Sequence, residues 1–412
     1  MPADCVSHIK AYLNLRILIV NKFFYPRGGD CVVAMNTQRL LESKGHDVRI
    51  YAMTYPDNVD TSFNDSYASE VNFSAGIMGK ISAFKRIFGK GDIVDSFKKV
   101  LHEFKPDVVH LHNIHSYLSP VVGELAHQYG ARVVWTLHDY KLVCPSYSCR
   151  LPDGKNCEQC INGDIAVIKH KCMKGSALQS FIADVEARYW SRQRLVGFTD
   201  KFIAPSAFMS RKMQQGGLPE SKLTVVCNFI DPSKYDKIKS TPVKSDRQHS
   251  FCYIGRLSEE KGVRTLIKAA VKANVVLNIA GGGPLLEELK EKYRKNKNIH
   301  FLGHLSAEKT AELLMNSQAS IMPSECYENN PLGVIESLCA GTPVIGANIG
   351  GIPELIDNES GVVYPSGDVE DLADKLTSFD RSKYNNRDIS ERSLVRFSAE
   401  THYRQLLEAY EA

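Results

Sequence analysis

Short runs of β-branched and other apolar residues alternate with longer helical stretches along most of this 412-residue chain. In the first half the helical stretches 30–44 and 119–129 are each followed by a glycine, the usual helix stop. A regular alternation of strands and helices predicts a parallel sheet covered by helices on both faces. The strands expected in the first half are residues 15–20, 47–52, 107–111, 132–137 and 201–204.

The alternation begins again after residues 231–250, a polar stretch rich in Lys, Ser and Asp. The strands expected beyond it are residues 251–254, 275–280, 299–302, 319–322, 343–346 and 361–364. We therefore predict an α/β fold of two doubly wound, Rossmann-like domains, 1–230 and 231–388, that face a central cleft. The terminal segment 389–412 is expected to be one helix, about 389–410, that packs back on the first domain. Ligands bind such sheets at the carboxyl ends of the strands, so the cleft is the expected active site.

The charge and the termini exclude several classes of protein. Fifty-one basic and 47 acidic residues give a net charge of +4, too small to indicate a nucleic-acid partner. The N-terminus has no signal-peptide pattern, and no uncharged apolar stretch reaches the ~18 residues of a membrane span. We expect a cytoplasmic protein.

The most informative segment is residues 323–353, PSECYENNPLGVIESLCAGTPVIGANIGGIP. Asn330 as N-cap, Pro331 as first residue and Gly341 as stop predict a short helix over 331–340, just after a strand. The free amides at the start of a helix bind phosphate, so we expect Asn330, Leu332 and Gly333 to bind a phosphate group at this end.

Two glutamates flank this helix start. Glu328 lies in the preceding loop, where it would repel a phosphate unless it faces neutral groups such as sugar hydroxyls. Glu336 lies more than one turn into the helix and cannot share the same contacts. The spacing predicts one ligand with hydroxyl groups on either side of a diphosphate. The alternative is two solvated surface charges.

Other polar residues follow strands at the same kind of edge. Arg256 and Lys261 can neutralise a diphosphate, or they can pair with Glu259 and Glu260 at the surface. Gly28 and Gly29 follow the first strand and let the backbone approach a ligand. His138 follows the strand 132–137, where it is either a ligand contact or a structural histidine.

Together these residues resemble the retaining GT-B glycosyltransferases of family 4, which include bacterial polysaccharide and glycolipid transferases. The motifs are LRILIVNKFFYPRGGD, GRLSEEKG, AGGGPL, ENNPLGVIE and GTPVIGANIGGIPELI, over nearly the whole chain. The resemblance implies that Glu328 contacts the transferred sugar, Glu336 the ribose, Arg256 and Lys261 the diphosphate, and His138 the sugar near its reacting carbon. It also implies that Gly29 lets the first domain approach the leaving group.

The resemblance implies a nucleotide-diphosphate sugar as donor and a saccharide or lipid-linked saccharide as acceptor, in cell-surface polysaccharide synthesis. Cations and helix amides stabilise the departing diphosphate, so we expect no catalytic metal. We expect retention by same-face attack, without a covalent intermediate. The alternatives are a GT-B-type sugar-nucleotide epimerase, a Rossmann oxidoreductase, which lacks its G-x-G-x-x-G here, and a non-catalytic binding module.

A cysteine-rich insertion, 144–172, departs from the commonest family pattern. Its Cys-x2-Cys knuckle and two flanking thiols predict a structural zinc site, while reduced thiols, a disulfide or an iron-sulfur role are the alternatives. The predicted zinc ligands are Cys144, Cys157, Cys160 and Cys172.

An amphipathic stretch lies at residues 77–90, with Ile77, Met78, Ile81, Phe84 and Phe88 at helical spacing. Its basic residues predict peripheral contact with an anionic membrane, at the inner face of the plasma membrane, and the alternative is an ordinary core-packing helix. These basic residues are Lys80, Lys85, Arg86 and Lys90. His110, His112 and His115 follow another strand, where acceptor contact or simple packing is expected rather than metal binding.

Overall fold

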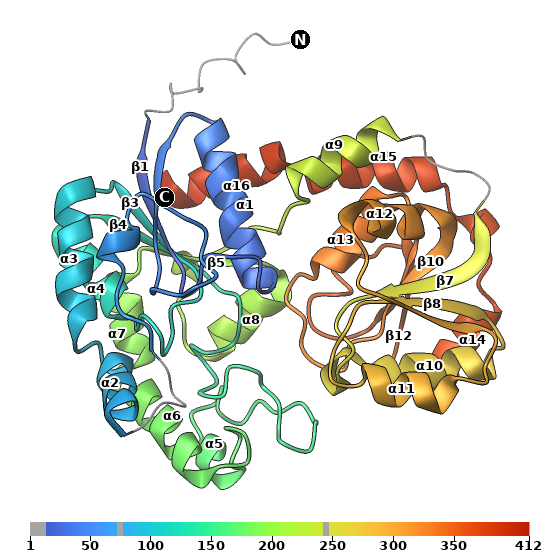
Figure 1. The fold of residues 1–412 in the computed structure, drawn as a ribbon, viewed down its shortest axis with the longest axis horizontal. Helices are drawn as coiled ribbons and strands as arrows, with labels where there is room; N and C mark the ends of the chain where they lie inside the picture. Colours follow the sequence, from blue (N-terminus) through green and yellow to red (C-terminus); the bar gives the residue numbers. More distant parts are fainter. Residues whose placement is uncertain (1–13, 72–76, 242–246, 412) are drawn as a thin grey trace.

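The computed structural model describes residues 14–71, 77–241 and 247–411. It has two lobes, each built on a six-stranded sheet whose paired strands run parallel, with helices on both faces (Figure 1). The predicted α/β fold with two doubly wound sheets is confirmed. Among the described residues, no helix is both long and apolar enough to cross a bilayer.

The first sheet has the strand order β2-β1-β3-β4-β5-β6. Its inner strand β1 sends Leu18 and Val20 into the core on one face and Ile17 and Ile19 into the core on the other, which is why the run is apolar throughout. The strands are β1 (Arg16–Val20), β2 (Asp47–Tyr51), β3 (Val108–Leu111), β4 (Arg132–Thr136), β5 (Lys201–Ala204) and β6 (Leu223–Val225).

Helices cover both faces of this sheet (Figure 1). The α-helices are α1 (Gly29–Ser43), α2 (Ile77–Ile87), α3 (Asp92–Phe104), α4 (Val121–Tyr129), α5 (Ala166–Lys169), α6 (Ala177–Tyr189), α7 (Arg192–Phe198) and α8 (Ala207–Gln215), and the 3-10 turns are η1 (Asn64–Ser66) and η2 (Glu220–Lys222). The sequence pattern missed β6, an edge strand of only three residues that is no more than half-buried.

The second sheet has the order β12-β11-β10-β7-β8-β9. Its strands are β7 (Gln248–Ile254), β8 (Val276–Ala280), β9 (Ile299–Gly303), β10 (Ser317–Met322), β11 (Val344–Ala347) and β12 (Gly361–Tyr364). Its helices and 3-10 turns are η3 (Glu259–Lys261), α10 (Val263–Lys272), α11 (Leu286–Tyr293), α12 (Ala307–Asn316), α13 (Leu332–Cys339), α14 (Val369–Thr377) and η4 (Arg381–Lys383). The polar stretch between the sheets contains α9 (Pro232–Ser240), capped by the Asp231 side chain.

The expected terminal helix is instead two helices, α15 (Asn386–Arg396) and α16 (Ala399–Glu411). The helix is interrupted between them. Phe397 is buried and its carbonyl accepts a hydrogen bond from the Ile230 amide, while the Ser398 hydroxyl accepts one from Thr401 N. Helix α15 packs on α13 of the second lobe, and α16 crosses to α1, β4 and β5 of the first (Figure 1).

The cysteine-rich insertion follows β4 and reaches the second lobe. Asn156 Nδ2 donates to the Glu325 carbonyl at 3.2 Å, and the Tyr327 hydroxyl donates to Glu158 Oε1 at 2.7 Å. The insertion therefore contacts the loop that carries Glu328.

Candidate active site

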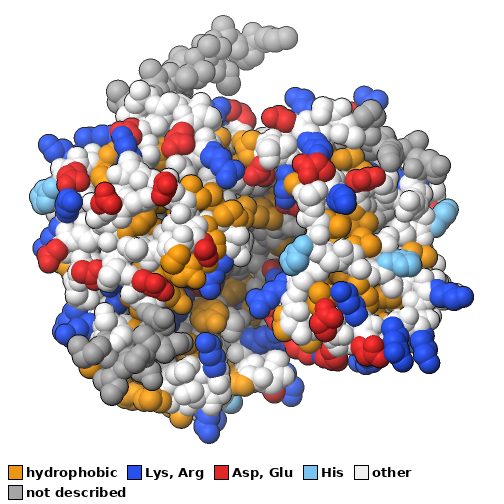
Figure 2. Space-filling view, in the orientation of Figure 1, with side chains coloured by type: hydrophobic (Ala, Val, Ile, Leu, Met, Phe, Trp, Pro, Cys, Tyr) orange, Lys and Arg blue, Asp and Glu red, His pale blue; other side chains and the backbone are white. Residues whose placement is uncertain are grey.

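A cavity of about 520 Å³ lies between the lobes, at the carboxyl ends of strands from both sheets. Figure 2 shows the surface hollowed there, with Lys and Arg side chains at the edge. Eight of the predicted site residues line this cavity: Gly29, His138, Arg256, Lys261, Glu328, Asn330, Leu332 and Gly333. Residues separated by up to 304 positions in sequence, Gly29 and Gly333, thus share one site.

Glu328 is held from its side chain and from its backbone. Its Oε1 accepts hydrogen bonds from Lys261 Nζ at 2.5 Å and from the Ser324 hydroxyl at 2.7 Å. Its carbonyl accepts the Gly351 amide at 2.7 Å, an approach that leaves no room for a side chain at Gly350, where a Cβ would lie 2.3 Å from the same oxygen. The glycines of the GGIP motif therefore support the loop that presents this carboxylate.

Lys261 ends η3, just before α10. Burial opposes its charge, but the Glu328 carboxylate raises the pKa of Lys261, which keeps the ammonium charged. The next residue, Gly262, has φ +66°, and a Cβ there would lie 1.8 Å from the Pro323 carbonyl oxygen. Only glycine lets the Lys261 turn pack against the loop after β10.

Arg256 follows β7 and is exposed at the cavity edge. The alternative of a surface pair with Glu259 or Glu260 is not what the structure shows, because Glu259 pairs with Arg264 and Glu260 accepts from the Ser258 hydroxyl. Arg256 and Lys261 therefore lie on one wall of the cavity.

The start of α13 differs from the expected cap. The helix begins at Leu332 with Pro331 in the N-cap position, and Asn330 does not cap it. The Asn330 Oδ1 instead accepts hydrogen bonds from Asn228 N at 3.0 Å and Cys227 Sγ at 3.2 Å, since Asn330 is buried against the segment that follows β6. The predicted N-cap was wrong, but the amino end of α13 still borders the cavity through Leu332 and Gly333.

Two predicted donor-binding residues do not line the cavity. Glu336 pairs with Lys234 of α9, Oε1 to Nζ at 2.6 Å. Gly28 is the N-cap of α1, directly before the lining residue Gly29.

The first lobe contributes an acid and an amide that the sequence pattern did not single out. Asp30, in the first turn of α1, accepts a hydrogen bond from Asn113 Nδ2 at 2.9 Å, and both line the cavity. Burial disfavours the Asp30 charge, but His138 and Lys22 lower the pKa of this carboxyl below its usual range. Their positions after the first and third strands are the signal that could have found them.

His138 faces Asp30 in the cavity. Its Nε2 lies 2.9 Å from His112 Nδ1, and its carbonyl accepts from Asn329 Nδ2 at 2.6 Å. Burial lowers the pKa of His138 to about 4, although the Asp30 charge opposes that shift. The imidazole is therefore neutral at physiological pH.

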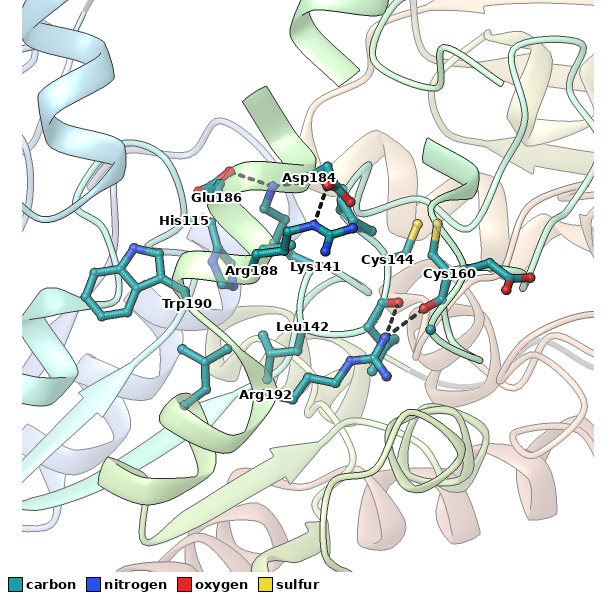
Figure 3. Close-up of a pocket in the computed structure, with 16 residues that line it drawn as sticks. His115, Lys141, Leu142, Cys144, Cys160, Asp184, Glu186, Arg188, Trp190 and Arg192 are labelled. Atoms are coloured by element: carbon teal, nitrogen blue, oxygen red, sulfur yellow. Dashed lines mark hydrogen bonds and ion pairs between the residues drawn. The ribbon is translucent and has the colours of Figure 1, made fainter. Parts of the chain in front are cut away.

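A second cavity, of about 210 Å³, lies between the insertion and α6. Figure 3 shows Cys144 and Cys160 on one side of it, with Arg192 donating to the Cys160 carbonyl. The buried ion pair of Lys141 and Glu186, 2.8 Å, lies on the other side. His115 also lines it.

The structure gives the predicted zinc site no support. The Cys144 thiol interacts with those of Cys149 and Cys160, and Cys149 is not one of the predicted ligands. Across the part of the chain that the structure describes, no group of three or more His, Cys, Asp or Glu residues has a geometry that could hold a metal ion. Zinc stays a prediction that metal analysis of the purified protein tests.

The amphipathic stretch forms α2, but one of its predicted surface cations is inside. Arg86 is 1% exposed and pairs with Asp92, and it donates to the Tyr117 carbonyl. It cannot meet a membrane. Phe84 and Ile81 are exposed, whereas the side chains of Ile77, Met78 and Lys80 lie outside the described residues.

The comparisons with known proteins agree with this architecture. Residues 27–234 match the protein family described as "Glycosyltransferase Family 4", and residues 234–394 match the family described as "Glycosyl transferases group 1". The N-acetyl-alpha-D-glucosaminyl L-malate synthase of Bacillus anthracis is 22% identical over 390 residues, 90% of this chain and 89% of that protein. The glycogen synthase of Mycobacterium tuberculosis is 33% identical over 196 residues, 45% of this chain, and the match spans about half of that enzyme, 46%.

Among solved structures, Anabaena Alr3699/HepE in complex with UDP and glucose superposes with a TM-score of 0.64 at 16% identity, covering 97% of this chain and all of that one (100%). Two Rossmann-like sheets around a charged cleft define the GT-B class of fold. The chain belongs to family 4 of the glycosyltransferases. None of these comparisons supports the epimerase alternative.

Proposed function

We propose that this protein is a retaining glycosyltransferase that moves a sugar from a nucleotide-diphosphate sugar to a hydroxyl of a saccharide or lipid-linked saccharide, in cell-surface polysaccharide synthesis. The observation that carries the proposal is the convergence of Arg256, Lys261, Glu328 and the amino end of α13 in one cavity. Anabaena HepE, with the same fold, was crystallised with UDP and glucose, which supports a nucleotide-sugar donor.

The cavity supplies charge where a diphosphate would leave. Arg256 as a fork, Lys261 as a point charge and the free amides of α13 stabilise the negative charge that develops on the departing oxygen. These groups perform the electrostatic task without a catalytic metal. Lys261 must turn from Glu328 toward the phosphate when the donor binds, which frees the Glu328 carboxylate for sugar hydroxyls.

Retention follows from attack on the face that the diphosphate leaves. The bond between the anomeric carbon and the phosphate oxygen breaks, the acceptor oxygen bonds to the same face of that carbon, and the hydroxyl proton passes to the leaving phosphate oxygen. This step needs no covalent glycosyl-enzyme intermediate. NMR of the anomeric proton of the product tests this, and an inverted linkage contradicts it.

The donor is identified by thermal-shift screening against UDP-, GDP- and ADP-sugars. A donor that binds only the native state raises the melting temperature, and the rise grows with the logarithm of its concentration over its Kd. The same donor should give transfer in the wild type, and Arg256→Ala with Glu328→Ala should abolish both responses. Unchanged turnover in these variants would refute the proposal.

We also assign the apolar and basic face of α2 and α6 to contact with an anionic membrane, where a lipid-linked acceptor resides. Phe84, Leu178 and Phe181 are half or more exposed, at 50%, 68% and 54%. Ring contacts continue from Phe84 through Phe88 to Tyr189, at 4.9 and 5.1 Å between centroids, so the two helices share one apolar surface. Exposed lysines lie on α2, just after it, on α5 and between α5 and α6: Lys85, Lys90, Lys169, Lys171 and Lys174.

The acids of α6 face away from this surface. Asp184 and Glu186 are buried and line the second cavity, and α2 has no acid in its sequence. Flotation with phosphatidylglycerol vesicles should fail for Lys85→Glu/Lys90→Glu and persist for the control Lys295→Glu/Lys297→Glu on the second lobe. Equal flotation of both variants would rule out this surface.

A further inference from the structure

We propose that His112 is a positioning residue that fixes His138 in the tautomer with its proton on Nδ1, so that His138 offers a hydrogen-bond donor to the cavity. The benefit to catalysis rests on the proposed function, whereas the tautomer itself does not.

His112 is placed by its backbone and by its neighbours. It follows β3 directly, its amide donates to the Val20 carbonyl at 2.9 Å, and its carbonyl accepts from Trp135 Nε1 at 2.9 Å. Its ring lies edge to edge with that of His138 and close to the same plane, with centroids 5.1 Å apart, planes 20° apart and the facing nitrogens 2.9 Å apart. The His112 ring, 1% exposed, therefore has one orientation behind His138.

On the other side the His112 ring meets His110, with centroids 4.3 Å apart. Both His110 nitrogens are already used, Nδ1 with the Tyr410 hydroxyl at 2.8 Å and Nε2 with the Thr136 hydroxyl at 2.7 Å. His110 packs against the His112 ring but cannot supply a partner to His112 Nε2. Among the described residues, that nitrogen is buried with no hydrogen-bond partner.

Burial keeps both rings neutral, so only one of the two facing nitrogens of His112 and His138, 2.9 Å apart, carries a proton and donates it to the other. If His138 donated, His112 would carry its proton on Nε2, a buried N–H with no acceptor. If His112 donates from Nδ1, its Nε2 is an acceptor without a donor. Buried acceptors without a partner are more common in proteins than buried N–H groups without one. The second arrangement is favoured.

The cavity favours the same arrangement. With Nε2 engaged by His112, Nδ1 is the His138 nitrogen left for a ligand, and His138 lines the cavity together with the Asp30 carboxylate. A proton on Nδ1 is stabilised by that negative charge, whereas a lone pair is not. His138 thus presents a donor, suited to an oxygen of the sugar or of the leaving group, and the polarity of this contact is set before substrate binds.

The experiment is nitrogen NMR of the protein labelled with [15N]histidine, with the His138 signals assigned by their absence in His138→Asn. In the wild type we expect His138 Nδ1 protonated and Nε2 bare. His112→Leu removes the donor to His138 Nε2, so the share of the Nε2–H form, which the free histidine side chain prefers, should rise. His112→Asn keeps an N–H near the Nδ1 position and should preserve the wild-type pattern. The control His127→Leu changes an exposed histidine on α4 and should alter nothing.

A wild-type spectrum with the proton on His138 Nε2 would overturn the proposal, and so would an unchanged tautomer in a folded His112→Leu. If His112→Leu does not fold, the wild-type spectrum still decides. In transfer assays kcat should fall about tenfold in His112→Leu and recover in His112→Asn, with donor KM little changed. Because the tautomer is read without turnover, its failure and that of the proposed function are distinguishable.

Discussion

Lys261 and Glu328 form an ion pair of 2.5 Å inside the cavity, although they lie 67 residues apart and belong to different loops. The Ser324 hydroxyl donates to the same carboxylate oxygen, so Oε1 is already engaged before any ligand is present. The two residues that are expected to bind opposite parts of a donor are therefore each other's partners in the free protein.

Lys261→Ala should lower kcat/KM for the donor about 100-fold, because it removes a cation from the leaving diphosphate and leaves the Glu328 charge without its partner. Steady-state kinetics with the donor found by the thermal-shift screen measure this. The control Lys272→Ala removes a lysine from the outer face of α10, where it pairs with Glu370, and should keep wild-type rates. Equal kinetics in both variants would contradict the role of Lys261.

Gly262→Ala should destabilise the second lobe by about 2 kcal/mol or more, since φ is +66° and the new Cβ would meet the Pro323 carbonyl oxygen. Urea unfolding measures the loss. The control Gly197→Ala lies in α7, with no atom within 4 Å of the added Cβ, and should be neutral or slightly stabilising. A Gly262→Ala protein as stable as Gly197→Ala would show that the loop after β10 can move aside.

Tyr410→Phe should cost roughly 1–3 kcal/mol of stability, because the hydroxyl that lies 2.8 Å from His110 Nδ1 is lost from a buried site. The matched control Tyr129→Phe changes a half-buried tyrosine on α4. Thermal unfolding of both variants measures the difference. A Tyr410→Phe effect no larger than the control would mean that this hydrogen bond adds little to the docking of α16 on the first lobe.

Stability should fall as the pH drops from 7 to 5. Burial lowers the pKa of His110 to about 3 and those of His138 and His402 to about 4, so in this range the unfolded chain takes up protons that the folded protein refuses. This stability is complete above the unfolded pKa of about 6.5 and is lost below it, on the order of 1 kcal/mol for each ring.

Urea unfolding at the two pH values checks this dependence. His402→Gln should flatten the pH dependence, because it removes one of the buried rings, whereas His127→Gln, at an exposed position, should not. A His402→Gln protein with the full pH dependence would show that this ring is not a source of it.

The sequence pattern predicted the strands well because each is a short apolar run inside a repeating unit, and it predicted the edge residues Glu328, Arg256, Lys261 and His138 because polar residues after buried strands are conspicuous. It erred where the outcome depends on a neighbour from elsewhere in the chain. Asparagine is a common N-cap residue, but the Oδ1 of Asn330 accepts hydrogen bonds from Cys227 and Asn228 instead of from the helix. Arg86 looks like a surface cation, but it is buried, where it pairs with Asp92 and donates to the Tyr117 carbonyl.

The amino-acid sequence by itself therefore determined the two doubly wound sheets and which residues follow their strands, since these depend on local hydrophobic periodicity and on glycine and proline stops. The tertiary structure alone decided that Asp30 and Asn113 join His138 in the cavity, that Lys261 meets Glu328, and that His112 backs His138. Hydrogen bonds and ion pairs between distant residues depend on how the two lobes and their loops pack, and no local pattern records that geometry.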